Sequence, residues 1–256
     1  MAEWDAEAYG RINDLQAMMA DRALQGLALN GAERVLDVGC GDGRVTAAIA
    51  ARLPGGHVVG VDQSASMIGA ARERLGTTDR ATFVVADAAE LSFRSEFDLV
   101  VSFNALHWVT AWPQALRRIR NAVHAGGQAL LVLVCDGDRP SLEDVVTTTA
   151  EQPHWRRHIT AAVPFVHVNP DAYAAAATSD GWVVDDLRVD DVEWEFGTRA
   201  AFFAWASAGL VAWTSQLPPA SVQPFLTEVL DTYADVVGSE SRFAFLQLRA
   251  ALTLPI

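Results

Sequence analysis

The stretch RVLDVGCGDGRVTAAIA, residues 34–50, decides the fold of this chain. An apolar run ends in an acid, Asp37, and a glycine-rich turn that includes Gly39 and Gly41 leads into a helical pattern. A glycine turn between a strand and a helix lets a ligand approach the backbone closely, because no side chain intervenes. The stretch therefore predicts a parallel sheet with a ligand site at the end of its first strand.

A second apolar run, HVVGVD (57–62), also ends in an acid, Asp62. In a doubly wound sheet the ends of neighbouring strands face the same crevice. A carboxylate at the tip of the second strand can accept hydrogen bonds from both hydroxyls of a ribose. Taken alone, Asp62 is also compatible with a helix cap or a solvated turn. Together with the glycine turn it predicts ribose binding.

The rest of the chain continues the alternation of strands and helices. Strands are predicted at 34–39, 57–62, 81–87, 97–103, 127–134, 182–189 and 242–252, and helices at 12–29, 44–53, 65–75, 113–123, 169–181, 198–218 and 222–237. Apolar strands that alternate with helices are typical of a parallel sheet covered on both faces. We predict a single α/β domain, residues 1–256, with a doubly wound, mostly parallel sheet. Its parts are an N-terminal helix over the active site (1–30), a cofactor-binding core (33–135) and lid insertions at about 136–168 and 193–237.

Composition excludes several classes of function. The net charge of −13 disfavours nucleic acid and anionic membranes as partners, because both need a basic surface. The two cysteines have no metal-ligand spacing, so no metal is expected and a reducing compartment is indicated. No apolar run approaches the roughly 20 residues of a membrane span. The expectation is a cytoplasmic enzyme that acts on a small molecule.

The spacing of the glycines argues against a dinucleotide. The dinucleotide fingerprint is G-x-G-x-x-G, whereas this chain has G-x-G-x-G with Arg44 following. Asp37, two residues before the first glycine, would also place a negative charge near a pyrophosphate. Both features favour a ligand with a cationic centre.

Four segments, VLDVGCGDG (35–43), GVDQSASMI (60–68), VVADAAEL (84–91) and FDLVVSFNALHWV (97–109), resemble the successive motifs of class I S-adenosylmethionine-dependent methyltransferases. The resemblance implies a seven-stranded sheet, with an antiparallel last strand, and a helical lid. It also implies S-adenosyl-L-methionine as the methyl donor, S-adenosyl-L-homocysteine as the product and no metal.

The same resemblance implies a role for each matching position around the methionine part of the donor. Gly39 and Gly41 would pass beneath that part, and Asp37 would reach its ammonium through water. Asn104 would lie near the methionine carbons.

Around the nucleoside, the resemblance implies that Asp62 holds the ribose hydroxyls with Gln63 beside it. Asp87 would accept a hydrogen bond from the adenine amino group, with the backbone of Ala88 alongside. Met67 would pack against adenine, although ordinary core packing explains a methionine at this position equally well.

Two features of the sequence, one near its start and one after the strand predicted at 97–103, concern the methyl acceptor. Tyr9, Asn13 and Gln16 fall at i, i+4 and i+7 on one helix face, and Trp108 ends the triplet L-H-W. Together they resemble the carboxylic-acid O-methyltransferases of the juvenile hormone acid and fatty acid type. In that group a helical glutamine and this tryptophan grip the acceptor carboxylate, which implies catalytic roles for Gln16 and Trp108 and substrate contact by Tyr9 and Asn13. His107 would be either a positioning residue or a packed one.

The acceptor class depends on the lid. The segment 198–218 resembles the cap helix of trans-aconitate methyltransferases, and its large apolar residues, Trp205 and Trp213 among them, predict an apolar pocket. We therefore expect a fatty or isoprenoid acid as substrate, with a methyl ester as product. The segment 155–158 and His167 could instead hold a polyacid, so a trans-aconitate-type acceptor is the alternative.

Two further alternatives remain open. Methylation at carbon or at a phenolic oxygen would need a base, such as His107. A protein that binds the cofactor without catalysis would keep the same glycines and acids.

Overall fold

The computed structural model describes residues 15, 18–19, 22, 24–25, 27–76 and 78–256. Contacts divide the chain into two compact units. We call the first the core unit; it comprises Ala20–Asp136, Phe165–Asp190 and Gln247–Ile256. We call the second the helical unit; its described part lies mainly in Gly137–Pro164 and Asp191–Leu246. Each unit is described by itself.

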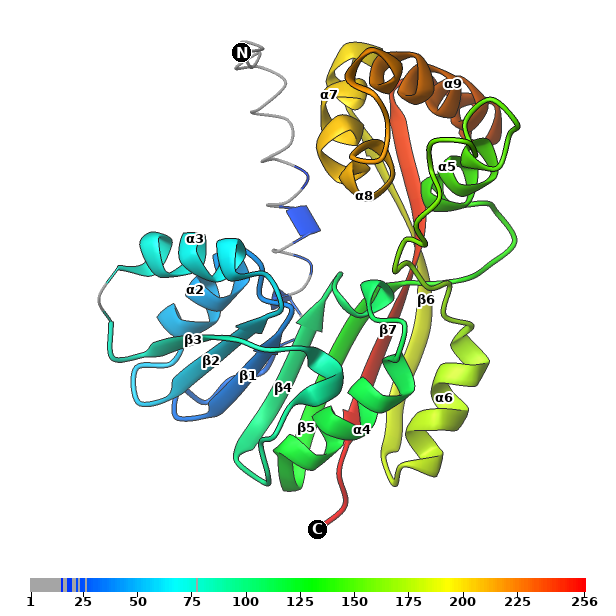
Figure 1. The fold of residues 1–256 in the computed structure, drawn as a ribbon. Helices are drawn as coiled ribbons and strands as arrows, with labels where there is room; N and C mark the ends of the chain where they lie inside the picture. The colour runs from blue at the N-terminus through cyan, green and yellow to red at the C-terminus, as the bar shows by residue number, and fades with distance from the viewer. Residues whose placement is uncertain (1–14, 16–17, 20–21, 23, 26, 77) are drawn as a thin grey trace. The chain divides into compact units, whose positions relative to one another are not determined.

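The core unit holds the alternating elements (Figure 1). Its strands are β1 (Arg34–Val38), β2 (His57–Asp62), β3 (Ala81–Val85), β4 (Phe97–Phe103) and β5 (Val123–Val134), and its helices are α2 (Arg44–Ala51), α3 (Ala65–Leu75), α4 (Trp112–Ala122) and α6 (Pro170–Ser179), with the 3₁₀ turns η1 (Ala88–Glu90) and η2 (Leu106–Trp108). The helical unit holds α5 (Leu142–Ala150), α7 (Arg199–Gly209), α8 (Val211–Thr214) and α9 (Pro219–Val237). The strands β6 (Val183–Glu195) and β7 (Arg242–Thr253) contribute residues to both units.

The sheet has seven strands in the order β3-β2-β1-β4-β5-β7-β6. Pairings among β1 to β5 are parallel, and β7 runs antiparallel to β5, with Val134 opposite Gln247. The chain moves outward from β1 to β3, then returns to the other side of β1 as β4. Strand order therefore reverses between β1 and β4, which is where open α/β sheets bind their ligands. The predicted mostly parallel sheet with an antiparallel last strand is confirmed.

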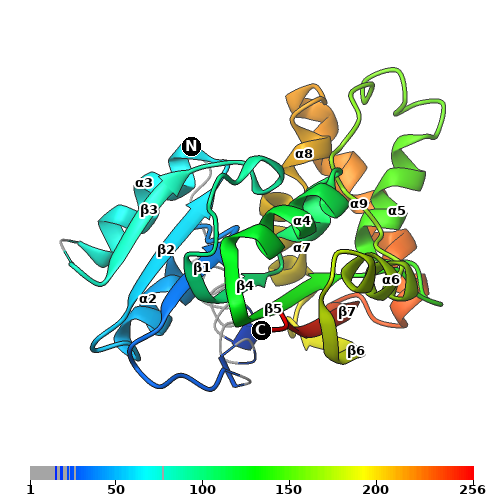
Figure 2. The same ribbon diagram turned by 90° about the horizontal axis from the view of Figure 1, so that it is seen from below.

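Helices cover the two faces of the sheet because right-handed crossovers in opposite directions lie on opposite sides. On one face Ile49 and Leu53, from α2 and the turn after it, pack against Val35, Val101 and Val132. The helices α4 and α6 lie in front of the sheet in Figure 1, and Figure 2 shows them next to one another. Their contact is a stack of Trp112 on Tyr173, with ring centroids 5.3 Å apart.

Two predicted elements differ most from their expected bounds. The single helix expected at 198–218 is two helices, since α7 ends at Gly209 and α8 begins at Val211. Glycine loses more conformational freedom in a helix than other residues, so Gly209 favours a break at this point. The strand β6 extends to Glu195, six residues beyond the predicted end. Its charged residues obscure the pattern, but Val192 is buried and Trp194 half-buried, which is the alternation expected of a strand.

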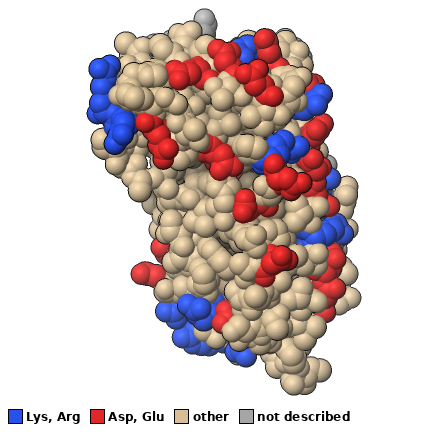
Figure 3. Space-filling view, turned by 90° about the vertical axis from the view of Figure 1, so that its right-hand side faces the viewer, with Lys and Arg blue, Asp and Glu red and all other residues tan. Residues whose placement is uncertain are grey.

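The strand β6 forms one edge of the sheet and carries many charges. In the core unit Arg188 lies 3.5 Å from both Asp186 and Asp190, and all three side chains are solvent-accessible. Figure 3 shows acidic and basic side chains close together along the right-hand edge of that view. Charged side chains on an edge strand discourage pairing with another chain, so these residues protect the exposed edge.

Two buried tyrosines differ in their hydrogen bonding. In the helical unit, Tyr233 Oη donates to the Ala244 carbonyl at 2.6 Å and accepts from the Ala244 N–H at 3.0 Å. In the core unit, the hydroxyl of Tyr173 is buried and makes no hydrogen bond to any described residue. The first hydroxyl satisfies two backbone groups, whereas the second is an uncompensated polar group.

We therefore expect opposite results from two matched substitutions. Tyr233→Phe should lower the free energy of unfolding by about 1–3 kcal/mol, because two buried backbone groups lose a partner. Tyr173→Phe should leave it unchanged or raise it slightly. Urea unfolding of both variants checks this, and an equal loss in the two would contradict the assignment.

Candidate active site

A pocket of about 360 Å³ lies at the carboxyl ends of β1, β2 and β4, in the core unit. Its walls come from the loops that follow these strands: Val38, Gly39, Gly41, Val61, Asp62, Gln63, Ser64, Met67, Ala86, Asp87, Ala88, Asn104, Ala105, Leu106, Trp108 and Val109. Eight of the nine predicted cofactor residues are in this set, together with Trp108. The charged side chains on the wall are Asp62 and Asp87, so the lining carries acids and no basic group. Such a wall suits a cationic ligand better than a pyrophosphate.

The glycine turn fixes one wall of the pocket. The N–H groups of Gly39 and Cys40 both donate to the Val61 carbonyl, at 2.8 and 3.0 Å, which joins the end of β1 to the end of β2. Gly39 has φ +75°, and a Cβ there would lie 2.1 Å from the Cβ of Ala105. Gly41 has φ +53°, and a Cβ there would meet no atom within 4 Å. Packing therefore requires the first glycine, whereas the second leaves open space for a ligand.

The carboxylate of Asp62 is held in place by two backbone N–H groups. Oδ2 accepts from Gly41 at 3.0 Å, and Oδ1 accepts from Ser64 at 2.8 Å. The N-cap of α3 is Ser64, whose hydroxyl accepts from the N–H of Met67. The helix-cap alternative for Asp62 is therefore wrong. A carboxylate has about four acceptor positions, so two remain for ligand hydroxyls.

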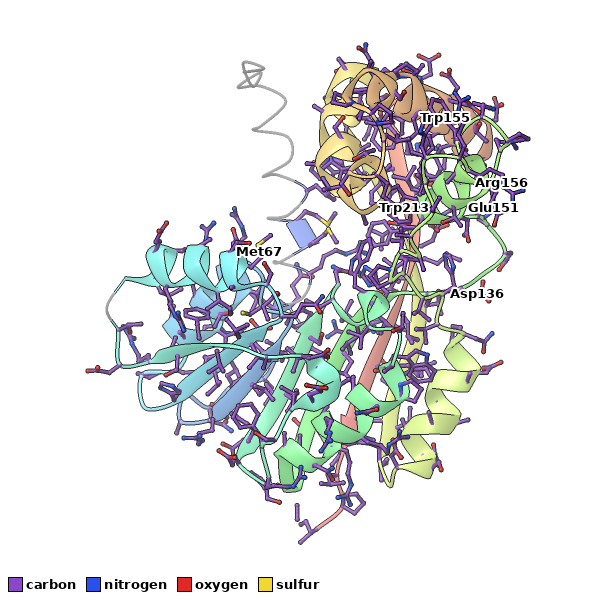
Figure 4. All side chains as sticks on the ribbon, viewed as in Figure 1. Met67, Asp136, Glu151, Trp155, Arg156 and Trp213 are labelled. Atoms are coloured by element: carbon purple, nitrogen blue, oxygen red, sulfur yellow. The ribbon has the colours of Figure 1, made fainter. Side chains whose placement is uncertain are left out.

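Asp87 and Met67 lie on the side of the pocket formed by β3 and α3. Asp87 Oδ1 accepts from the N–H of Ala89 at 2.8 Å and so begins η1, which leaves its exposed carboxylate able to accept from a ligand. Met67 is 46% exposed and projects from the first turn of α3 (Figure 4). The core-packing alternative for Met67 is therefore wrong. Adenine contact by Met67 and Asp87, with Gln63 and Ala88 nearby, stays a prediction.

Asp37 does not line the pocket. It is buried at the end of β1, where the hydroxyl of Thr46 donates to its Oδ2 at 2.6 Å. Burial is the main cause that raises its pKa to about 6; the Thr46 hydrogen bond opposes this shift and the negative charge of Asp62 adds to it. The resemblance implied that Asp37 contacts the ligand ammonium indirectly, through water. The structure places its carboxylate behind the glycine turn, outside the pocket lining, and the water-mediated contact stays a prediction.

Asn104 follows β4 in the left-handed conformation, with φ +54°. Its N–H donates to the Val132 carbonyl at 2.8 Å. Its Oδ1 accepts from Nε2 of Gln247, a buried residue of β7, at 2.8 Å. Sequence reasoning missed Gln247. The signal was present, because Gln247 is an uncharged polar residue inside the apolar run RFAFLQLRAAL (242–252).

His107 and Trp108 share η2 but differ in surroundings. His107 is 4% exposed and is not part of the pocket wall; its Nδ1 accepts from the Val134 N–H at 3.3 Å. Burial, with a smaller contribution from His167, lowers its pKa to about 3, so the ring is neutral at pH 7. Trp108 lines the pocket and packs edge-to-face on Phe165, with ring centroids 5.2 Å apart. The structure favours the packed role for His107 over that of a base.

The other predicted substrate residues are not among the described residues of the pocket lining. Tyr9, Asn13 and Gln16 fall outside the described residues. Trp213 is 2% exposed and Trp205 packs on Phe243 with ring centroids 4.5 Å apart, both within the helical unit. Their contact with substrate stays a prediction.

The segment 155–158, considered for a polyacid, also belongs to the helical unit. Trp155 is buried and its indole N–H donates to Glu228 at 2.9 Å, so it anchors the segment. Arg156 and Arg157, which directly follow Trp155, are exposed (Figure 4 labels Trp155 and Arg156).

The part of the chain that the structure describes shows neither a metal site nor a membrane-spanning helix. No group of three or more His, Cys, Asp or Glu side chains in this part of the chain could hold a metal ion. No helix in it is long and apolar enough to cross a membrane.

Comparison with known proteins agrees with this site. Residues 35–127 match the family model of the methyltransferase domain. The chain is 30% identical over 210 residues to trans-aconitate 2-methyltransferase of Afipia carboxidovorans, covering 77% of this chain and 80% of that enzyme. It is 25% identical over 238 residues to "Putative methyltransferase 235L" of Invertebrate iridescent virus 6, covering 92% and 87%. The YcgJ protein from Bacillus subtilis has a similar fold, with a TM-score of 0.67, 18% identity and coverage of 95% and 99%.

The chain therefore belongs to the class I S-adenosylmethionine-dependent methyltransferases. Within that class it is similar to the trans-aconitate methyltransferases. The resemblance inferred from the four motifs is confirmed.

Substitutions of the two glycines in the turn should have different effects. Gly39→Ala should destabilise the fold by about 2–4 kcal/mol, because the left-handed backbone is strained and the new methyl overlaps Ala105. Gly41→Ala should cost only about 1–2 kcal/mol for its positive φ, yet weaken S-adenosylhomocysteine binding at least tenfold by occupying ligand space. Thermal unfolding and calorimetry separate the two effects. Equal behaviour of the variants would refute this division.

The raised pKa of Asp37 predicts how stability depends on pH. Because the folded state holds this proton more tightly than the unfolded state, stability falls as pH rises from about 4 to about 6. Asp37→Asn cannot ionise and still accepts from Thr46. It should therefore raise the free energy of unfolding at pH 8 by up to about 3 kcal/mol, with little gain at pH 4. Urea unfolding at pH 4, 6 and 8 measures this, and a gain independent of pH would contradict the cause.

Proposed function

We propose that this protein transfers the methyl group of S-adenosylmethionine to a carboxylate of a small polyacid of the trans-aconitate type. The products would be a monomethyl ester and S-adenosylhomocysteine. The observation that carries the proposal is a pocket whose described lining has an indole donor, two acids for the donor nucleoside and no histidine, lysine or arginine. The relatives at about 30% identity that are named trans-aconitate 2-methyltransferases support this acceptor class.

The polyacid takes precedence over the fatty or isoprenoid acid expected from the sequence. That expectation relied on the large apolar residues of 198–218 as a pocket lining. In the helical unit Phe202 is 1% exposed and Trp213 is 2% exposed. Phe202 also packs on Phe196, with ring centroids 5.3 Å apart. Phe202 and Trp213 are therefore used in packing, which weakens the main argument for an apolar acceptor.

Binding of the donor would use groups whose positions the fold already fixes. Asp62 would accept from the ribose hydroxyls through the two acceptor positions that Gly41 and Ser64 leave open. Asp87 would accept from the adenine amino group. The donor supplies an electrophilic methyl on a positively charged sulfur, and the acidic wall favours that charge.

The acceptor carboxylate is already a nucleophile at neutral pH, because an unperturbed carboxyl group titrates near pH 4. One of its oxygens would form the new bond to the methyl carbon while the carbon–sulfur bond breaks and its electrons go to sulfur. Alignment of the two groups can contribute about 7–11 kcal/mol. The indole N–H of Trp108, and the amide of Gln16, are neutral donors that would orient the carboxylate without strong charge pairing.

Methylation at carbon or at a phenolic oxygen is less compatible with the site. Either reaction needs a base near the acceptor, and His107 was the candidate. His107 is buried away from the pocket wall, and its lowered pKa makes it a weak base. A carboxylate acceptor needs no such group.

Methyl transfer from S-adenosylmethionine carrying a tritiated methyl group tests the acceptor class directly. The panel would be trans-aconitate, cis-aconitate, citrate, dodecanoate and a phenol. We expect transfer to trans-aconitate at least tenfold faster than to dodecanoate, in a product that releases labelled methanol in mild base. Faster methylation of dodecanoate would restore the apolar acceptor. A base-stable product, or no transfer to any acid, would refute carboxyl methylation.

The pH profile gives an independent prediction. Between pH 7 and 9, kcat/KM should vary by less than about twofold, because the acceptor is ionised and His107 is neutral throughout. Trp108→Phe should lower kcat/KM at least tenfold while leaving the Kd of S-adenosylhomocysteine within about threefold. A profile that rises steeply through pH 7–8 would instead indicate a catalytic base.

A further inference from the structure

Asn104 lines the pocket with a carboxamide whose two ends have opposite hydrogen-bonding character. Its backbone is fixed by the left-handed conformation and by the 2.8 Å bond from its N–H to Val132. Asparagine is one of the few residues that adopt this conformation readily, so its side chain leaves the turn in a defined direction. Which end of the amide faces a ligand then depends on its neighbour.

That neighbour is Gln247 of β7. Its Nε2 lies 2.8 Å from Oδ1 of Asn104 and donates to it. Gln247 is 8% exposed and its strand is paired with β5 opposite Val134, so the sheet fixes the position of its backbone. With Oδ1 occupied, the Nδ2 group on the other branch of the amide supplies the donors that remain for a ligand.

We propose that Gln247 is a positioning residue, which orients Asn104 so that its amide N–H groups donate to a ligand carboxylate in the pocket. The inference deepens the proposed function, since a carboxylate enters this pocket from two sources. One is the amino-acid end of the methyl donor, and the other is the methyl acceptor. An amide N–H suits the carboxylate of either ligand, because the charged side chains of the pocket wall are both acids.

Substitution of Gln247 separates orientation from general stability. Gln247→Met removes the donor at nearly constant size, so the amide of Asn104 loses its fixed orientation. Gln247→Glu, measured at pH 9, places an acceptor at 247 and so reverses the amide, which turns an oxygen towards the ligand. The matched control is Gln128→Glu, on the exposed side of β5 in the same sheet.

Calorimetry with two ligands, S-adenosylhomocysteine and its decarboxylated analogue, provides a measurement that does not require turnover. If the donor carboxylate is the partner, Gln247→Met should raise the Kd of S-adenosylhomocysteine about tenfold and Gln247→Glu more. The Kd of the decarboxylated analogue should change less than twofold. If the acceptor carboxylate is the partner, both Kd values should hold and the acceptor KM should rise about tenfold.

The proposal is overturned if both ligands weaken equally, or if neither the Kd values nor the acceptor KM change. A third variant keeps the proposal testable even if Gln247→Glu does not fold. Asn104→Gly accepts the positive φ and removes the amide, so Gln247→Met should have no further effect in that background. Additive effects would show that Gln247 does not act through Asn104. Failure of methyl transfer to acids would count against the proposed function. The Kd comparison between S-adenosylhomocysteine and its decarboxylated analogue would be unaffected by that failure.

Discussion

The site depends on the pair of hydrogen bonds that joins the end of β1 to the end of β2. Gly39 and Cys40 donate to the same carbonyl, that of Val61. This contact brings the glycine turn beside Asp62, whose carboxylate then accepts from Gly41. Because Gly39 has no side chain, Ala105 after β4 can pack directly on it. Three strand ends are thereby drawn to one place, and the pocket results from how closely their backbones approach.

Near the carboxyl ends of the strands, the charge states of side chains depend on burial as much as on which residues are present. Asp37 and His107 are both behind the pocket wall, and burial disfavours the charged form of each. The pKa of Asp37 is raised to about 6, whereas that of His107 is lowered to about 3. At neutral pH the carboxylate is therefore ionised and the imidazole is neutral. The pocket wall carries the acids Asp62 and Asp87, which suits a cationic ligand, and none of its described residues is basic.

Much of the core unit could be predicted from local sequence, since strands such as HVVGVD and turns such as GCGDG carry their own periodicity and backbone requirements. The positions of Asp62, Asp87 and Asn104 at strand ends followed from the parallel sheet. Gln247 is visible as a polar residue in an apolar run, but its contact with Asn104 could not be predicted, because the two meet across 143 residues through the antiparallel return of β7. Whether the aromatic residues of 198–218 line a pocket could not be predicted for a related reason. Apolar character shows that a side chain avoids water, but whether it faces a ligand or its own helical unit depends on packing partners far away in sequence.

The strands β6 and β7 are continuous, yet each supplies residues to both units. Exchange of helical units between relatives, by recombination or by design of chimaeras, would have to cut and rejoin both strands in register. A slip of one residue in either strand would reverse every side chain beyond the junction from one face of the sheet to the other. In β7 such a slip would also remove Gln247 from Asn104. The helical unit is therefore more easily altered through point substitutions than replaced by that of a relative.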